Sequence, residues 1–285
     1  MGNNNNGRPS MFSKEEDAYI LDNYLIKTSG EIGVFLGYSA KQIQSRAKIL
    51  GLRKNRVFDN RYFENIDTSE KAYWLGFLYA DGWVVYNDKR KNYEVGIELQ
   101  RNDKYMLERL NNTLGGAFTI KDIDKEHVFV VQSYCNVYTS VLRMYSKPMA
   151  MDLISHGVVP NKTYKKEHPV VSDDLFADFF RGYFDGNGCI YDYVRKTTGR
   201  SYVQLNITTP NDSFALYCHD KLQELYDIET GLYHEQEFKN RVVITQMPKI
   251  AKLCEIMYAN PTAPKLLRKY DIYNSNFGPQ AEQSA

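Results

Sequence analysis

The chain has 285 residues, of which 43% are hydrophobic, and its formal net charge is +1. A chain of this length can bury a substantial core in two or three compact units. The near-neutral charge argues against a protein that coats nucleic acid without specificity, because such binding needs many phosphate contacts. The four cysteines are widely separated, which favours neither a zinc site nor a disulfide framework. Without a long apolar stretch or a secretory signal, we expect a cytoplasmic protein with no membrane partner.

The N-terminal part of the chain predicts a small helical domain. Residues 1–10 are polar and Asn-rich, and we expect them to form a disordered tail. Ser13 and Glu16 have the spacing of a capping box, and apolar residues follow at helical intervals. This pattern predicts a first helix from Lys14 to about Leu25.

Two further helices are predicted before residue 54. The second covers Glu31 to Leu36 and ends before Gly37, which can adopt the left-handed conformation that ends helices. The third begins at Ser39, where Gln42 completes another capping box, and stops at Gly51. Residues 11–54 are therefore expected to be a three-helix domain, followed by a basic linker over residues 55–67.

The exposed face of the third predicted helix combines phosphate-seeking and base-reading side chains: Lys41, Gln42, Gln44, Ser45 and Lys48. The segment from Phe12 to Leu52 resembles the Myb-like or helix-turn-helix modules of DNA-binding proteins. That resemblance implies a recognition helix for the major groove. Arg53 and Lys54 would add contacts to the DNA backbone. The alternative is a helical bundle that only caps the larger domain or binds protein.

The remainder of the chain contains an internal repeat. The nonapeptides Trp74–Gly82 and Phe180–Gly188 align without gaps, and each precedes a strand pair, a helix, two more strands and a helix. Each copy therefore predicts the order αββαββα. We expect repeat 1 over residues 68–160, an inter-repeat linker over 161–172, repeat 2 over 173–270 and a C-terminal tail over 271–285.

Alternating apolar and polar residues predict strands with one buried face. The polar face of the second copy contains Gln204 and Asn206, which can hydrogen-bond base edges. The first copy contains Glu94 and Glu98, which would repel phosphate, so the second sheet is the better candidate for reading bases. The expected DNA contacts of the repeats are Lys89, Arg90, Gln100, Arg195, Lys196, Tyr202, Gln204 and Asn206.

Each nonapeptide is expected to form a helix. Thr68 or Ser69 would cap the first helix, and Ser172 would cap the second. Gly76 and Gly182 hold equal positions within these helices, where glycine costs about 1 kcal/mol relative to alanine. We expect the two helices to pack closely at these glycines, which would explain why glycine is present despite that cost.

The residue before each helix end gives the strongest indication of chemistry. Gly82 and Gly188 are expected to stop the helices, so Asp81 stands at a helix C-terminus, facing the negative end of the helix dipole. A carboxylate loses about 0.3 to 1 kcal/mol in that position unless a cation offsets it. A divalent metal ion would provide this charge.

These motifs and their setting resemble the LAGLIDADG homing endonucleases in their monomeric, two-repeat form. The resemblance implies an α+β fold in which two pseudo-symmetric αββαββα repeats form a DNA-binding saddle, here preceded by the small three-helix domain. It also implies site-specific cleavage of double-stranded DNA with Mg²⁺ or Mn²⁺, with Asp81 and Asn187 as catalytic positions. The metal ligands would come from Asp81, Asn187, Ala80 and Gly186. The protein would act as a monomer and be intron-encoded or free-standing.

The chain departs from the family pattern at Asn187, which stands where the first copy has Asp81. An amide oxygen can bind a hard cation but carries no charge and cannot act as a base. Asp185 lies about 200° around the helix and cannot simply replace the missing acid. Three explanations stay open: an asymmetric site that still cuts, an enzyme that nicks one strand, or an inactivating Asp-to-Asn change.

The family also uses a lysine near the end of the last strand of each repeat. The alignment places Gln132 and Gln246 in that region, with Lys121 and Lys239 only as distant candidates, so this role stays unassigned. The main alternative function is a DNA-binding regulator or intron maturase that has lost cleavage. A protein-interaction module that uses the 23 tyrosines as a contact surface is a third alternative.

Overall fold

The computed structural model describes residues 11–24, 27–52, 58–130, 133–162, 165–194, 196–197, 199–236 and 239–278. The chain divides into two compact units, Met1–Val57 and Phe58–Ala285, so the division lies close to the boundary expected after residue 54. Each unit has a hydrophobic core of its own. Among the described residues, no helix is long and apolar enough to cross a membrane.

The first unit contains three helices, α1 (Lys14–Asn23), α2 (Ser29–Leu36) and α3 (Ala40–Ile49). The predicted capping boxes at Ser13 and Ser39 are both present, and Gly37 ends α2 with a φ of 78°. A third capping box, at Thr28, was not predicted, and it starts α2 earlier than expected. The core of the unit consists of Phe12, Ile20, Tyr24, Ile32, Ile43 and Ala47.

The second unit confirms the predicted order αββαββα in both repeats. The first repeat contains α4 (Ser69–Asp81), β1 (Gly82–Asn87), β2 (Asn92–Gln100), α5 (Lys104–Thr113), β3 (Ile120–Val130), β4 (Ser133–Met144) and α6 (Lys147–Ser155). The second contains α7 (Phe176–Asn187), β5 (Gly188–Val194), β6 (Ser201–Thr209), α8 (Asp212–Tyr226), β7 (Gly231–Gln236), β8 (Lys239–Ile244) and α9 (Met247–Tyr258). A further helix, α10 (Leu267–Phe277), extends into the region expected to be a tail from residue 271.

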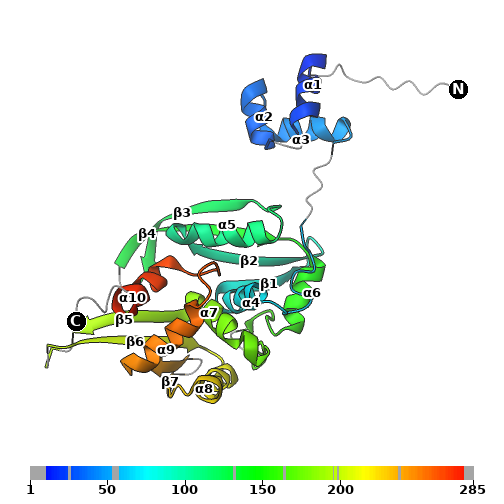
Figure 1. Ribbon diagram of the computed structural model, residues 1–285. Helices are drawn as coiled ribbons and strands as arrows, with labels where there is room; N and C mark the ends of the chain where they lie inside the picture. The colour runs from blue at the N-terminus through cyan, green and yellow to red at the C-terminus, as the bar shows by residue number, and fades with distance from the viewer. Residues whose placement is uncertain are drawn as a thin grey trace. The chain divides into compact units, whose positions relative to one another are not determined.

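Two antiparallel four-stranded sheets have equivalent topologies, in the orders β1-β2-β4-β3 and β5-β6-β8-β7. Figure 1 shows α5 over the first sheet and α8 and α9 over the second, with α4 and α7 in the middle of the unit. The predicted alternation is confirmed, because Val95, Ile97 and Leu99 on β2 are buried. Their counterparts on β6, Val203, Leu205 and Ile207, are buried as well.

The starts of the two motif helices differ from each other. Thr68 caps α4 as predicted, because its side chain accepts a hydrogen bond from the backbone N–H of Lys71. The prediction that Ser172 caps the second motif helix is wrong. Ser172 precedes a short 3₁₀ helix over Asp173–Leu175, and α7 begins at Phe176 without a side-chain cap.

Candidate active site at the ends of the motif helices

The two motif helices touch through their backbones, as predicted from their glycines. A methyl group on Gly76 would lie 2.1 Å from the carbonyl oxygen of Phe179 on α7. A methyl group on Gly182 would lie 2.0 Å from the carbonyl oxygen of Tyr73 on α4. Any side chain larger than hydrogen would therefore separate the helices. This contact brings the C-terminal ends of α4 and α7 together.

Gly82 and Gly188 end the helices, but not in the left-handed conformation. Both are extended, with φ of −81° and −98° and ψ of 167°. Glycine is required here for space, because a methyl group on Gly82 would lie 2.7 Å from the carbonyl oxygen of Leu78. One on Gly188 would lie 2.2 Å from the Phe184 ring. In each repeat the chain thus passes directly from the motif helix into the first strand of the sheet.

Asp81 is the last residue of α4 and lies partly buried beside α7. A methyl group on Gly186 would lie 2.3 Å from Cβ of Ala80 and 3.2 Å from Oδ2 of Asp81, so Gly186 allows this close approach. Burial raises the pKa of the Asp81 carboxyl, while the positive charges of Lys162 and Lys269 act in the opposite direction. The carboxylate therefore lies in a site where a cation would stabilise its charged form.

Asn187 occupies the equivalent end of α7. Its Nδ2 lies 3.3 Å from the hydroxyl of Tyr183 and donates to it, and that hydroxyl donates to the carbonyl oxygen of Thr208 at 2.9 Å. The side chain faces a small cavity of about 90 Å³ lined by Tyr79, Ala80, Lys162, Tyr183, Asn187, Thr209 and Pro210. This half of the site contains an amide in place of a carboxylate.

Asp185 does not compensate for Asn187. It is almost fully buried, and its Oδ2 accepts hydrogen bonds from the hydroxyl of Tyr73 at 2.7 Å and the backbone N–H of Leu266 at 2.9 Å. Burial raises the pKa of this carboxyl. The structure confirms that Asp185 cannot replace the missing acid, because it is directed into the interior.

Two lysines hold the ends of the motif helices. Lys162 Nζ donates to the carbonyl oxygens of Leu78 at 3.1 Å, Ala80 at 3.0 Å and Gly82 at 2.7 Å. Lys269 Nζ donates in the same way to those of Phe184 at 2.6 Å, Asp185 at 2.7 Å and Gly188 at 2.6 Å. These carbonyls belong to the last turn of each helix and to the glycine that follows it, where the backbone leaves acceptor capacity unused.

Burial lowers the pKa of both Lys162 and Lys269 to about 8. The nearest acids act in the opposite direction: Asp81 for Lys162, and first Asp185 for Lys269. The site therefore contains two ammonium groups, one at each helix end, in an environment that excludes much of the water.

Neither Lys162 nor Lys269 is among the candidates that the sequence offered for the family's lysine, whose role stayed unassigned. Gln246 is the residue before α9, and Gln132 lies outside the described residues. Lys121 and Lys239 lie on strands β3 and β8. The missed signal is that each repeat continues, after its last helix, into a segment with a lysine: Lys162 falls in the predicted linker and Lys269 in α10.

The oxygen donors at the helix ends fit a hard divalent cation. They are the carboxylate of Asp81, the side-chain oxygen of Asn187 and the backbone carbonyls of Ala80 and Gly186, which match the ligand preference of Mg²⁺. The Ala80 carbonyl also accepts from Lys162, and its second lone pair can still bind a metal. In the part of the chain that the structure describes, no group of three or more His, Cys, Asp or Glu gathers. A metal here would need additional oxygens from substrate or water.

The predicted DNA contacts on the sheets differ in accessibility. Lys89 and Arg90, in the turn between β1 and β2, are exposed, as are Gln100 and Lys196. Tyr202 and Gln204 are half-buried on β6, whereas Asn206 is only 8% exposed and is poorly placed as a contact. Arg53, Lys54 and Arg195 lie outside the described residues.

In the three-helix unit, α3 exposes four of the five predicted contact residues: Lys41, Gln44, Ser45 and Lys48. Gln42 differs, because its Oε1 accepts hydrogen bonds from the backbone N–H of Ser39 at 2.8 Å and from its hydroxyl at 2.7 Å. Gln42 is therefore a capping residue, with its carbonyl oxygen already engaged.

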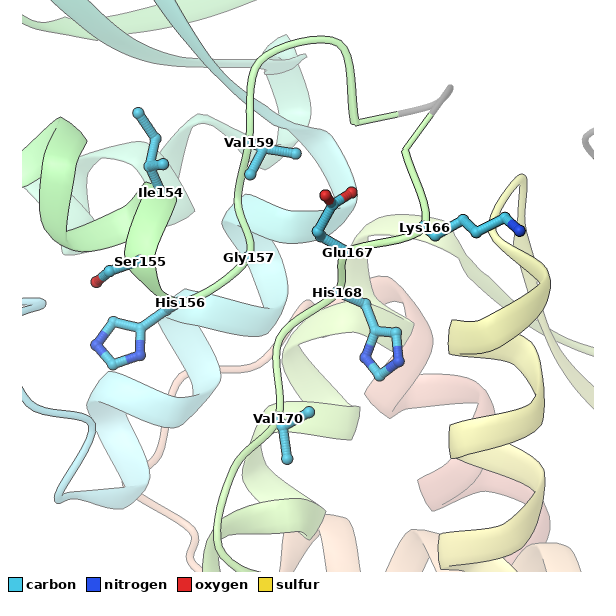
Figure 2. Close-up of a pocket in the computed structure, with 9 residues that line it drawn as sticks. All are labelled: Ile154, Ser155, His156, Gly157, Val159, Lys166, Glu167, His168 and Val170. Atoms are coloured by element: carbon cyan, nitrogen blue, oxygen red, sulfur yellow. The ribbon is translucent and has the colours of Figure 1, made fainter.

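A larger cavity, of about 480 Å³, lies elsewhere in the second unit. It is formed by the end of α6 and the following segment, and Figure 2 shows its lining: Ile154, Ser155, His156, Gly157, Val159, Lys166, Glu167, His168 and Val170. The ring of His168 lies against those of Phe214 and Tyr217, at centroid distances of 5.6 and 5.1 Å. No residue at the ends of α4 or α7 lines this cavity, so it is separate from the candidate site.

Comparison with known proteins shows the class of fold. No family model matches the sequence. The LAGLIDADG homing endonuclease I-GzeII, in complex with its DNA target, superimposes with a TM-score of 0.50 at 9% identity, over 75% of this chain and 91% of that one. The meganuclease I-SmaMI, bound to uncleavable DNA, covers 74% and 95% of the two chains, with a TM-score of 0.48 and 13% identity. The LAGLIDADG meganuclease I-AabMI, bound to uncleaved DNA, covers 74% and 92%, with a TM-score of 0.47 and 12% identity.

The chain thus has the two-repeat α+β saddle fold of the LAGLIDADG homing endonucleases. The fold of the second unit is the one expected from the duplicated nonapeptides. The similarity covers about three quarters of the chain at low sequence identity.

Proposed function

We propose that this protein is a homing endonuclease, which hydrolyses phosphodiester bonds of double-stranded DNA at a long, specific site with the help of Mg²⁺ or Mn²⁺. The observation that carries this proposal is the close packing of α4 against α7 at Gly76 and Gly182. This packing places Asp81, Asn187 and two lysines at one end of a helix pair that lies between two antiparallel sheets. The fold shared with I-GzeII, which was solved with its DNA target, supports it further.

Asp81 is the residue best suited to hold a metal ion, with Asn187 and the carbonyls of Ala80 and Gly186 as additional oxygen ligands. When bound, the ion would polarise a phosphate and lower the pKa of a water molecule. The chain's own cations, Lys162 and Lys269, stand beside this position and would stabilise negative charge that develops on a phosphate. Their hydrogen bonds to the helix ends keep both ammonium groups fixed.

The two sheets would contact the major groove on either side of the cut, and the three-helix unit would extend the recognition site through α3. Because one chain contains both repeats, we propose that it acts as a monomer. The gene would be intron-encoded or free-standing. The difference between Asp81 and Asn187 would make the two strands unequal substrates, because only one half of the site offers a carboxylate.

A second candidate function is a DNA-binding regulator or an intron maturase that has lost cleavage. Asn187 favours it, since an uncharged ligand weakens metal binding in that half. The two functions predict the same DNA binding and differ only in the fate of the phosphodiester bonds.

The deciding experiment incubates the full-length protein and Mg²⁺ with supercoiled plasmid. The plasmid carries the genomic sequence that flanks the gene, joined as if the gene were absent. Linear product supports the double-strand endonuclease, and open-circular product supports a nicking enzyme. Unchanged plasmid together with a specific gel shift would overturn cleavage and leave the regulator or maturase.

A further inference from the structure

The start of α10 lies where the two repeats meet. The backbone N–H of Leu266 donates to Oδ2 of Asp185 on α7 at 2.9 Å. The backbone N–H of Leu267 donates to the hydroxyl of Tyr105 on α5 at 2.7 Å. These two bonds fix the start of α10 between a helix of repeat 2 and a helix of repeat 1. Arg268 is the next residue along the chain.

Arg268 is held by a buried acid and is itself exposed. Its Nε donates to Oδ2 of Asp103, the residue before α5, at 3.2 Å. The Asp103 side chain is only 8% exposed, whereas that of Arg268 is 55% exposed. Asp103 stands at the N-cap of α5, yet its side chain does not cap this helix. Its hydrogen bond to Nε fixes the orientation of the guanidinium instead.

Arg268 differs from the two lysines in the donors that it can offer to a ligand. An ammonium group has three N–H donors, and Lys162 and Lys269 each donate to three backbone carbonyls. Within the described ranges, the two terminal nitrogens of the Arg268 guanidinium have no hydrogen-bond partner. A guanidinium can bind two oxygens of one phosphate through a pair of N–H groups. Among these three cations, Arg268 is therefore the one that can contact a phosphate directly.

The charge of Arg268 acts on the candidate metal ligand of α4. Burial raises the pKa of the Asp81 carboxyl, and the positive charges of Lys162, Lys269 and Arg268 oppose this increase, in decreasing order. The charge of Asp103 acts on Asp81 as well, in the same direction as burial. The pair of Arg268 and Asp103 therefore lies in the neighbourhood of Asp81.

The two helix ends differ at this position too. Asn161 precedes Lys162 in the chain, as Arg268 precedes Lys269. An amide can donate a hydrogen bond to a phosphate, but it carries no charge. The site therefore has one half with a carboxylate and an arginine, and one half with amides at both positions.

We propose that Arg268 binds a phosphate of the DNA beside Asp81, with its guanidinium positioned by Asp103. This inference rests on the proposed function, because the phosphate belongs to a DNA duplex at the ends of the motif helices. It adds a direct phosphate contact that neither lysine can make, and it places this contact in one half of the site only.

The first step of the test measures binding without divalent metal, so that the DNA is not cut. The DNA is a duplex with the joined genomic sequence that flanks the gene. Arg268→Met should raise the dissociation constant about tenfold. It should also reduce the slope of log K against log salt concentration by about 0.9. Arg268→Lys keeps the charge and should keep the slope, with a smaller loss of affinity because the paired N–H groups are gone.

The matched control is Arg109→Met. Arg109 donates to the carbonyl oxygen of Thr262, in the segment before α10, and lines a cavity with Thr68 and Ser69 at the start of α4. The helix rises about 18 Å from there to Asp81. The control should keep the affinity and the slope of the wild type. If Arg268→Met keeps both as well, the proposed contact does not exist.

The second step locates the phosphate. Neutral methylphosphonate replaces one phosphate at a time across the central base pairs of both strands. At the phosphate that Arg268 contacts, the wild type should lose affinity and Arg268→Met should lose no more. At other phosphates the two proteins should lose affinity equally. Equal losses at every position would overturn the inference, and so would a difference that appears only at a phosphate remote from the cut.

The third step separates a phosphate contact from a purely structural tie between the repeats. Asp103→Asn removes the acid and keeps the charge of Arg268, so it should weaken binding and leave the salt slope unchanged. Urea unfolding of both variants is measured in parallel. If Arg268→Met and Asp103→Asn reduce stability equally and neither changes the slope, the pair only joins α10 to repeat 1.

The proposed function and this inference fail in different ways. If the wild type binds its duplex specifically but does not cut it in Mg²⁺, cleavage fails, and the binding measurements still decide the role of Arg268. If the wild type cuts and Arg268→Met shows no change in slope, this inference fails alone. If the wild type shows no specific binding, both are wrong.

Discussion

Lys162 and Lys269 make similar hydrogen bonds at the ends of the two motif helices. Each ammonium group donates to three backbone carbonyls, Lys162 at the end of α4 and Lys269 at the end of α7. A cation at a helix C-terminus is stabilised by the helix dipole, but burial favours its neutral form. In both lysines burial has the larger effect, since it lowers the pKa to about 8.

This relationship predicts a dependence of stability on pH. The pKa of Lys162 is about 8 in the folded protein and close to its ordinary value of 10.5 when unfolded. Between these values the unfolded chain binds more protons than the folded one, so the free energy of unfolding should rise with pH. The destabilising effect of the buried charge is fully present below pH 8 and is relieved by about pH 10.5.

The measurement compares urea unfolding of the wild type and of Lys162→Met at several pH values from 7 to 10. The wild type should gain stability relative to the variant as the pH rises. Lys269→Met should show the same behaviour, because the pKa of Lys269 is also lowered to about 8. Parallel pH profiles of the wild type and both variants would disprove the lowered lysine pKa values.

Gly76→Ala and Gly182→Ala should each destabilise the second unit. A methyl group at either position would lie about 2 Å from a backbone carbonyl oxygen of the other helix, and backbone atoms cannot turn away. Overpacking of this kind costs about 1 to 3 kcal/mol or more. Gly30→Ala is the control, because its methyl group would meet only the Thr28 hydroxyl, at 3.8 Å. Unchanged melting of the 58–285 unit in the Gly76 and Gly182 variants would contradict the observed contact.

The fold could be predicted from the sequence because its signals are local and occur twice. The capping box at Ser13, the alternation along β2 and the two nonapeptides each depend on residues close together in the chain. The C-terminal segment was harder to predict. Residues 271–277 were expected to be a tail, but they belong to α10, which contacts the rest of the unit through bonds such as that between the Leu267 N–H and the Tyr105 hydroxyl.

The site could be predicted only in part. Asp81 and the glycines follow from the spacing inside each nonapeptide. The lysines do not, because Lys162 and Lys269 reach the helix ends through tertiary contacts between residues more than 80 positions apart. The neutralisation of Glu94 by Arg143 also depends on strand pairing, since the two residues belong to different strands, β2 and β4. A sequence pattern shows that an acid is present but not which cation lies beside it.

Asp81→Asn should remove cleavage and leave DNA binding intact. The substitution takes away the carboxylate that we propose as a metal ligand, while the shape of the side chain is kept. Loss of such electrostatic stabilisation lowers a rate by about 10² to 10³-fold. Binding measured in EDTA should be equal or slightly tighter, because a carboxylate near phosphate repels it. Undiminished cutting by Asp81→Asn would refute the role given to this residue.

Asn187→Asp should increase double-strand cleavage. The new carboxylate would give the end of α7 the charge that Asp81 gives to α4, and with it a stronger metal ligand. The readout is the ratio of linear to open-circular plasmid. Faster cutting of the strand served by the α7 half of the site would convert open-circular plasmid into linear plasmid and raise this ratio. Asn187→Ala is the matched control and should not increase cutting. If Asn187→Asp gives no gain, the asymmetry belongs to the native mechanism.

Deletion of residues 1–57 should shorten the DNA footprint without moving the cut. The deleted unit has its own core, built around Ile20, Ile32 and Ile43, and the remaining unit keeps both sheets and both motif helices. Lys41 and Lys48 are exposed on α3, and each phosphate contact contributes about 0.9 to the slope of log K against log salt concentration. Loss of these two contacts should reduce the slope by about 2. Lys41→Ala with Lys48→Ala in the full-length chain tests the same surface without removing the unit, and should reproduce the change in slope. An unchanged footprint and an unchanged slope would show that the three-helix unit does not bind the target.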